Sequence, residues 1–214
     1  MKRIVLFAFV AVALMAAGCG KAYYATMEKM GYEKREIMAD RVVDARDAQQ
    51  DAKEQFASAL DMFKSVVNFN GGTLEEKYET LNDEYEASEA RAQKVRDRIE
   101  SVEDVAEALF DEWQDEITQY SSAKLRRSSQ AKLAETQNRY NRLLRAMKRA
   151  SSRMDPVLAA FKDQVLYLKH NLNAKAIAAL EGELSAIRGD VDVLVREMEK
   201  SIAEADAFIR TLDQ

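Results

Sequence analysis

The sequence is poor in the residues that end or cross-link secondary structure. Its 214 residues include one proline, seven glycines and a single cysteine, Cys19. A sheet protein needs more turn formers than this, so long helices are expected. A lone cysteine excludes a disulfide within the chain. With one histidine, His170, few of the usual catalytic and metal sites can be built.

The usual catalytic and cofactor patterns are missing as well. No Gly-x-x-x-x-Gly-Lys phosphate loop occurs, and the residue three before His170 is Tyr167, not the Glu of a di-iron site. A zinc site would need carboxylates almost alone, which suits zinc poorly. The serines have no histidine placed to activate them. We therefore expect no catalytic residues, no metal and no cofactor, and interpret the chain as a non-enzyme.

Residues 1–18 have the features of a cleaved secretory signal. Lys2 and Arg3 precede an apolar stretch over residues 4–15, and small residues occupy positions 16–18. The apolar stretch is shorter than the roughly 20 residues that cross a bilayer. This combination is typical of a signal peptide and not of a spanning helix.

The signal ends in Ala-Ala-Gly-Cys at positions 16–19, which resembles the lipobox of bacterial lipoprotein precursors. Ala16 departs from the pattern, because Leu is more usual there. The resemblance implies that Cys19 becomes the acylated N-terminus and anchors the chain stably through several acyl chains. Gly20, where Asp would be a retention signal, implies sorting to the outer membrane. The alternative is an ordinary cleaved signal followed by a free thiol.

The rest of the chain, residues 19–214, is expected to be one all-α domain, an elongated antiparallel coiled-coil bundle of three long helices. Apolar and small residues recur at alternating steps of three and four, which is a coiled-coil seam. In the central helix the seam runs through Leu74, Tyr78, Leu81, Tyr85, Ser88, Ala92, Val95, Ile99, Val102, Ala106, Leu109, Trp113 and Tyr120. Matching seams flank it, so each long helix has a partner.

Two turn signals divide the helices, at about 22–69, 73–154 and 156–213. Gly71-Gly72 precedes Thr73-x-x-Glu76, which is a capping box that starts a helix. Pro156 disfavours helical dihedrals in Asp155 and suits a first helical position, so a second turn is expected there. The central helix would then be about 120 Å long. The nearly apolar-free stretch 121–130 is a possible break, but continuity is favoured because it contains neither Gly nor Pro.

Three stretches of the mature chain resemble DUF2959, a family of proteobacterial lipoproteins defined by a domain of unknown function. The first stretch runs from Asp-Ala-Gln-Gln at 47–50 to Phe-Asn-Gly-Gly at 69–72. The second is Val-Ala-Glu-Ala-Leu-Phe-Asp-Glu-Trp at 105–113. The third runs from Asp-Pro-Val-Leu at 155–158 to Lys-His-Asn-Leu-Asn at 169–173. The resemblance implies no mechanism. Some members carry a DNA-repair label, which long coiled coils resembling those of chromosome-maintenance ATPases would explain.

The charge distribution is uneven along the expected central helix. Residues 73–120 hold 16 acidic and 5 basic side chains, a net charge of −11, whereas residues 121–154 hold 10 basic and 1 acidic, a net charge of +9. The basic residues opposite the seam form a candidate anionic-surface site on Arg142, Arg145, Arg149 and Arg153. It would bind anionic lipid, lipopolysaccharide or peptidoglycan. The alternative is a solvated face, or self-association with the acidic half of another copy.

A second candidate lies where the last seam slips by one residue. It is a polar recognition spot of Lys169, His170, Asn171 and Asn173, and the alternative is a local polar step that satisfies itself. The leading functional hypothesis is an outer-membrane-anchored periplasmic lipoprotein that acts as a non-enzymatic interaction or envelope-organising module. Its partners would be the membrane through Cys19 and a protein partner or a second copy. The alternative is a nucleic-acid-associated coiled-coil protein, against which stands that a lipidated envelope protein does not meet nucleic acid.

Overall fold

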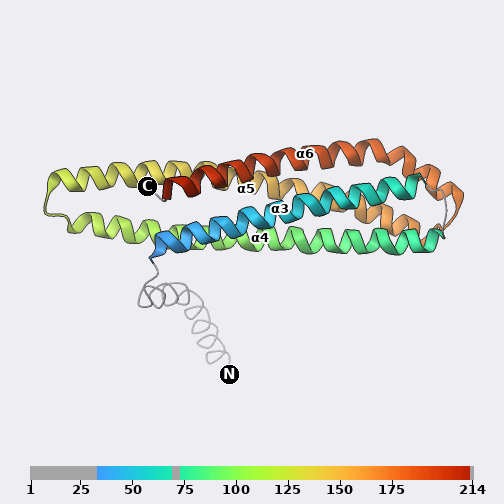
Figure 1. The fold of residues 1–214 in the computed structure, drawn as a ribbon, viewed down its shortest axis with the longest axis horizontal. Coiled ribbons are helices and arrows are strands. Elements are labelled where there is room, and N and C mark those ends of the chain that lie inside the picture. Colours follow the sequence, from blue (N-terminus) through green and yellow to red (C-terminus); the bar gives the residue numbers. More distant parts are fainter. Residues whose placement is uncertain (1–32, 69–72, 213–214) are drawn as a thin grey trace, which may run out of the picture.

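The described part of the chain folds into four helices that pack as one elongated antiparallel bundle (Figure 1). The structure is a computed structural model and describes residues 33–68 and 73–212. The helices are α3 (Lys34–Val67), α4 (Leu74–Gln119), α5 (Ala123–His170) and α6 (Ala174–Leu212). The helix α3 packs on α4 and α6, and α5 packs on the same two helices. The all-α class was predicted correctly, but four helices replace the expected three.

The first hairpin follows the sequence prediction. Thr73 Oγ1 accepts a hydrogen bond from the Glu76 backbone N–H at 3.2 Å, and Glu76 Oε2 accepts one from the Thr73 N–H at 3.1 Å. This capping box satisfies two N–H groups that the first turn of α4 would otherwise leave unpaired. The predicted turn at Gly71-Gly72 lies outside the described residues. The seam of α3 is buried at Met38, Val42, Ala45, Gln49, Ala52, Phe56, Ala59, Phe63 and Val66.

The prediction that the central helix continues through residues 121–130 is wrong. The chain leaves α4 at Tyr120 and reverses within three residues, and Ser122 caps α5 by accepting a hydrogen bond from the Leu125 N–H. Arg126 donates to the Tyr120 carbonyl at 2.7 Å, which satisfies one acceptor at the end of α4. The seam of α5 is out of phase with that of α4, so one straight helix could not bury both. A serine cap and a phase shift therefore make the turn without glycine or proline.

The predicted turn at Asp155-Pro156 is also wrong, because Pro156 lies inside α5. Its ring is exposed, whereas Met154 and Val157 on either side are fully buried. Proline in a helix interior removes one hydrogen bond and costs about 3 kcal/mol. Burying an apolar side chain contributes about 1.5–3 kcal/mol, so the two flanking residues together offset that cost. Packing overrides the local preference of proline here.

The last turn, between α5 and α6, falls where the seam slips, at residues 171–173. Asn171 closes α5 as its C-cap, and Asn173 Oδ1 accepts hydrogen bonds from the backbone N–H groups of Lys175 and Ala176 at 3.0 and 3.2 Å. Asparagine is well suited to this position, because its side chain replaces the missing helical acceptor. The helix boundary expected at 154–156 therefore lies about 15 residues further along the chain.

The helices differ in length, and this shapes one end of the bundle. At 1.5 Å per residue the 46 residues of α4 span about 69 Å, and the 34 residues of α3 span about 51 Å. The α4–α5 hairpin extends beyond the start of α3 and the end of α6 (Figure 1). Beyond the ends of α3 and α6, the bundle consists of α4 and α5 alone. Ile117 of α4 and Leu133 of α5 are still buried there, and a pocket opens where α3 and α6 stop.

Candidate functional site

The four arginines predicted to bind an anionic surface are all exposed on α5. Arg149 is already engaged, because its Nε lies 3.8 Å from Glu197 Oε2 on α6. A hydrogen bond from Lys200, together with the charges of Lys200, Arg149 and Arg153, lowers the pKa of the Glu197 carboxyl. The acidic group that faces this stripe thus comes from the second half of α6.

The reversal at residues 120–122 folds the acidic and basic segments of the expected central helix onto each other. Lys148 of α5 forms an ion pair with Glu103 of α4, and Arg96 of α4 forms one with Asp155 of α5. The Lys148–Glu103 pair joins the basic segment to the acidic one within a single chain, a contact that the expected straight helix could make only with a second copy. Within the described residues, no ion pair involves Arg142, Arg145 or Arg153, although the charge of Arg153 acts on Glu197. These three, the part of the stripe without an ion pair, are its free part.

The predicted polar spot lies at the α5–α6 turn, and two of its members have structural roles. Asn173 caps α6, and Asn171 Nδ2 donates to the Tyr167 carbonyl at 2.9 Å. Lys169 and His170 occupy the last turn of α5, where positive side chains complement the helix dipole. The turn itself therefore accounts for the asparagines without a ligand.

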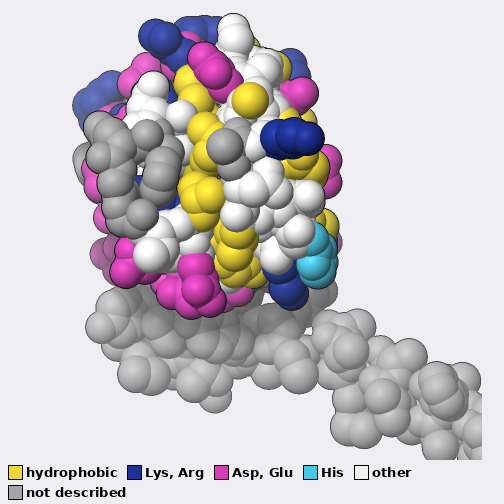
Figure 2. Space-filling model, turned by 90° about the vertical axis from the view of Figure 1, so that its right-hand side faces the viewer, with side chains coloured by type: hydrophobic (Ala, Val, Ile, Leu, Met, Phe, Trp, Pro, Cys, Tyr) yellow, Lys and Arg dark blue, Asp and Glu magenta, His cyan; other side chains and the backbone are white. Residues whose placement is uncertain are grey.

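The same end of the bundle carries exposed apolar side chains. Leu166, Tyr167 and Leu172 are 48%, 41% and 43% exposed. Figure 2 views this end and shows hydrophobic side chains in a narrow band between polar and acidic ones. Scattered apolar exposure of this kind is ordinary for a soluble surface.

Two further expectations concern the membrane and metals. Cys19, the predicted acylation site, lies outside the described residues. No helix among those described carries an apolar stretch long enough to cross a membrane. Within residues 33–68 and 73–212, no group of three His, Cys, Asp or Glu side chains is placed to hold a metal ion.

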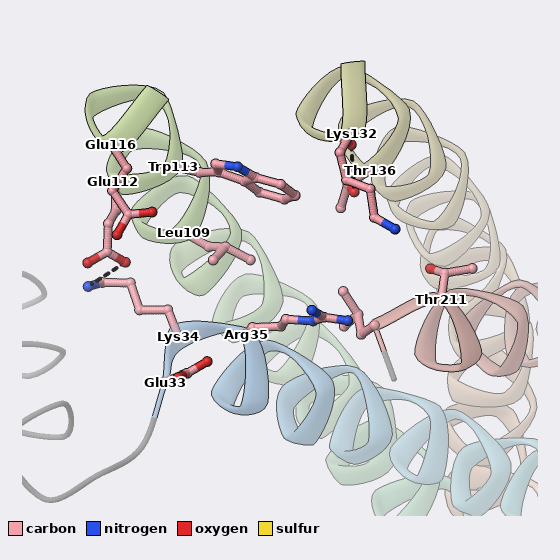
Figure 3. A pocket seen from close by; sticks show the side chains of 11 residues that line it. Glu33, Lys34, Arg35, Leu109, Glu112, Trp113, Glu116, Lys132, Thr136 and Thr211 are labelled. Atoms are coloured by element: carbon pink, nitrogen blue, oxygen red, sulfur yellow. Dashed lines mark hydrogen bonds and ion pairs between the residues drawn. The ribbon is translucent and has the colours of Figure 1, made fainter. Parts of the chain in front are cut away.

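A pocket of about 400 Å³, here called the end pocket, lies at the open end of the bundle. It lies between α4 and α5 where the two shorter helices stop (Figure 3). All four helices contribute, together with the residue that precedes α3. Its lining consists of Glu33, Lys34, Arg35, Leu109, Glu112, Trp113, Glu116, Lys132, Thr136, Thr211 and Leu212.

The aromatic wall of the end pocket is held in a fixed orientation. Trp113 projects from α4 toward α5 (Figure 3), and its indole N–H donates to Ser129 Oγ on α5 at 2.9 Å. This hydrogen bond satisfies the only polar atom of the ring, so the ring faces remain available for contact. Leu109 and Leu212 add apolar surface beside it.

Charged groups in the end pocket are separated by sign. Lys34 forms an ion pair with Glu112 at 3.0 Å, and Glu116 lies on the same side of α4 (Figure 3). Lys132 faces them from α5, and Arg35 extends from α3 across the pocket toward α6 (Figure 3). Among the described residues, neither Arg35 nor Lys132 has an ion-pair partner.

Sequence reasoning missed the end pocket. Trp113 was assigned to the core by its seam position, and it is only half-buried because α3 and α6 do not reach over it. Once the turn at 120–122 is placed, Trp113 falls near the ends of the two shorter helices, and a lone tryptophan at such a place is a usable signal. The pocket is a product of unequal helix lengths, and no local motif encodes it.

Comparison with known proteins identifies a family for nearly the whole described chain. No curated protein matches the sequence. The model of one family, described as protein of unknown function (DUF2959), matches residues 23–212. This match covers α3 to α6 and so includes both hairpins and the end pocket. The chain therefore belongs to the DUF2959 family.

Proposed function

We propose that the mature chain is a lipoprotein of the cell envelope, anchored to the periplasmic face of the outer membrane, and that its bundle is a non-enzymatic interaction module. One observation carries the proposal: Ala-Ala-Gly-Cys at 16–19 directly follows a basic start and a short apolar stretch. The Cys19 thiol can form a thioether to a diacylglyceryl group, and cleavage before Cys19 then leaves an N-terminal amine that can be acylated. Gly20 favours the outer membrane as the destination.

The length of the chain after the anchor supports a role at the membrane surface. Fourteen residue steps separate Cys19 from Glu33, where the bundle begins. Fully extended, they span at most about 50 Å. The bundle itself is about 70 Å long, so an anchored copy has a long side surface for contact with other envelope components.

The causes of the shifted pKa values support a binding role over a catalytic one. Burial raises the pKa of Tyr140 to about 12, and its ring packs against Phe110 and Phe208 with ring centroids at 5.4 and 6.5 Å. Hydrogen bonding to Arg139 lowers the pKa of Glu135. The pKa of a catalytic group is typically shifted by burial and by neighbouring charged residues that line the same cleft. Here the largest cause is burial in the core for Tyr140 and a hydrogen bond from the same helix for Glu135.

The free part of the basic stripe indicates the kind of partner. Arg142, Arg145 and Arg153 are exposed, point away from the core and have no described ion pair. We propose that they contact an anionic surface, either acidic lipid or cell-wall polymer. Each such residue contributes on the order of 1 kcal/mol near a charged membrane.

Fractionation of the cells that make this protein tests the proposed location. The chain is expected in the outer-membrane fraction, with Cys19 as its first residue and a mass increased by acyl groups. Extraction should require detergent and not salt, because acyl chains insert into the hydrocarbon region. Full-length protein with an intact Met1 in the cytosol would contradict the proposal.

Reversal of the stripe tests the proposed partner. Arg142→Glu, Arg145→Glu and Arg153→Glu together change the charge by six units, so binding to anionic vesicles or to isolated cell wall should be lost. The thermal midpoint should change little, since exposed charges contribute little to stability. Added salt should weaken the wild-type interaction in the same direction.

A matched control changes the same charge elsewhere. Lys162, Lys175 and Arg196 are exposed, and none has an ion pair among the described residues. Replacing all three by Glu should leave most of the binding intact if the stripe is the site. Equal loss in both triple variants would show that only net charge matters and would remove the stripe from the proposal.

A further inference from the structure

The end pocket combines separated charges, a fixed aromatic wall and an opening to solvent. Its volume of about 400 Å³ is within the range of small-molecule sites. A pocket of this kind normally holds a few polar groups that fix the ligand's orientation against an apolar wall. Which ligand fits is decided by the donors and acceptors that are not already used within the protein.

The unused donors lie on one side. Arg35 is exposed in the first turn of α3, and Lys132 is exposed on α5. Both line the pocket, and in Figure 3 the charged ends of both lie on the side of α5 and α6. Lys34 is different, because Glu112 already neutralises it. Two such cations can hold one phosphate, with Arg supplying a planar pair of N–H groups and Lys a point charge.

The unused acceptors are more numerous. Glu33 and Glu116 are exposed carboxylates of the lining, and in Figure 3 they lie on the side of α3 and α4. Thr136 and Thr211 donate their hydroxyl protons to the carbonyls of Lys132 and Phe208 in their own helices, at 2.9 and 2.7 Å. Their oxygens can therefore only accept a further hydrogen bond from a ligand.

A ligand that matches this arrangement carries an anion and a hydrogen-bonding cation a few bonds apart. A ligand with only an anionic group would leave the carboxylates without a partner, and a ligand with only a cationic group would be repelled by Arg35 and Lys132. An ammonium group fits beside Glu116 and against the face of Trp113, where a cation is attracted by the ring. Any apolar part of the ligand would rest on Leu109 and Leu212.

We propose that the end pocket binds a phosphoethanolamine group, with the phosphate held by Arg35 and Lys132 and the ammonium held by Glu116 and Trp113. The group has two sources, a lipid head group and the free soluble molecule. The pocket is too small for two long acyl chains, but its open side lets chains leave toward solvent or a bilayer. The proposal deepens the proposed role at the envelope and names a ligand for it.

Trp113 is the only tryptophan of the chain, so its fluorescence reports on this pocket directly. Purified full-length protein would be titrated with phosphoethanolamine and, separately, with monomeric dihexanoyl phosphatidylethanolamine. A saturable change in emission is expected with at least one of them. Equal affinities would assign the site to the soluble molecule, and tighter binding of the lipid would assign it to the head group. No saturable change with either probe would overturn the proposal.

Variants and analogues test the assigned contacts. Arg35→Glu and Lys132→Glu should each weaken binding at least tenfold, measured by calorimetry so that the result does not depend on fluorescence. Both positions are exposed, and Glu in the first turn of α3 is favoured by the helix dipole, so folding should be retained. Arg127→Glu, an exposed change on α5 outside the pocket, is the matched control and should bind normally.

The ammonium contact has its own test. Glycerol 3-phosphate carries the phosphate without the amine, and it should bind at least tenfold more weakly than phosphoethanolamine. Equal binding of the two would overturn the assignment of a zwitterion. Because these titrations use purified protein, their failure is distinguishable from a failure of the envelope location, which fractionation measures.

Discussion

The variant Cys19→Ala is expected to lose all incorporation of a fatty-acid probe and to be absent from the outer-membrane fraction. Alanine has no thiol, so no thioether to a diacylglyceryl group can form, and the peptidase that cuts lipoprotein signals has no modified substrate. The unprocessed precursor should accumulate. Labelling in cells followed by gel fluorescence measures the first effect, and the mass of the N-terminal peptide measures the second.

A neighbouring substitution provides the control. Gly20→Asp keeps the thiol, so it should keep full labelling and normal cleavage, but it should move the protein from the outer to the inner membrane. The two variants therefore separate acylation from sorting. Unchanged labelling in Cys19→Ala would refute the lipobox interpretation, and residues 1–18 would then be an ordinary signal before a free thiol.

The parts of the fold that sequence predicted are those set by local periodicity and capping. The seam of α3 and the capping box of Thr73 and Glu76 were placed correctly, because a heptad pattern and a T-x-x-E pattern each involve residues close in sequence. The turn at 120–122 was not predicted, because serine occurs inside helices as well as at their N-caps. Its signal was the phase shift between two seams, which a stretch poor in apolar residues obscured.

Pro156 shows the opposite error, a strong local signal overridden by packing. The seam passes Pro156 through Met154, Val157 and Phe161, all buried, and that continuity outweighs the lost backbone hydrogen bond. The charge pattern was read correctly, but its meaning depended on the missed turn. Once α4 and α5 lie side by side, Lys148 meets Glu103 in the same chain. The end pocket depends on where four helices stop, so it could not be predicted before both turns were known.

The largest expected effect on stability comes from a substitution where the two hairpins pack on each other. Phe161 of α5 is 1% exposed and packs edge-to-face on Phe63 of α3, with ring centroids 6.5 Å apart. Phe161→Ala should lower the free energy of unfolding by about 3–5 kcal/mol, since it removes buried apolar surface and leaves a cavity. Urea unfolding followed by circular dichroism measures the change. Tyr167→Ala on the same helix is the control, and it should cost less than about 1 kcal/mol because its ring is 41% exposed.

A double-mutant cycle with Phe63→Ala then tests the fold itself. In the four-helix bundle the two rings touch, so the cycle should give a coupling of about 0.5–1.5 kcal/mol. In a three-helix rod with a continuous central helix, Phe63 would pack near residue 79 and Phe161 near residue 149. At 1.5 Å per residue those positions are roughly 100 Å apart, and the coupling would be zero. A measured coupling within error of zero, with both single variants destabilising, would therefore favour the rod and place the turn back at Pro156.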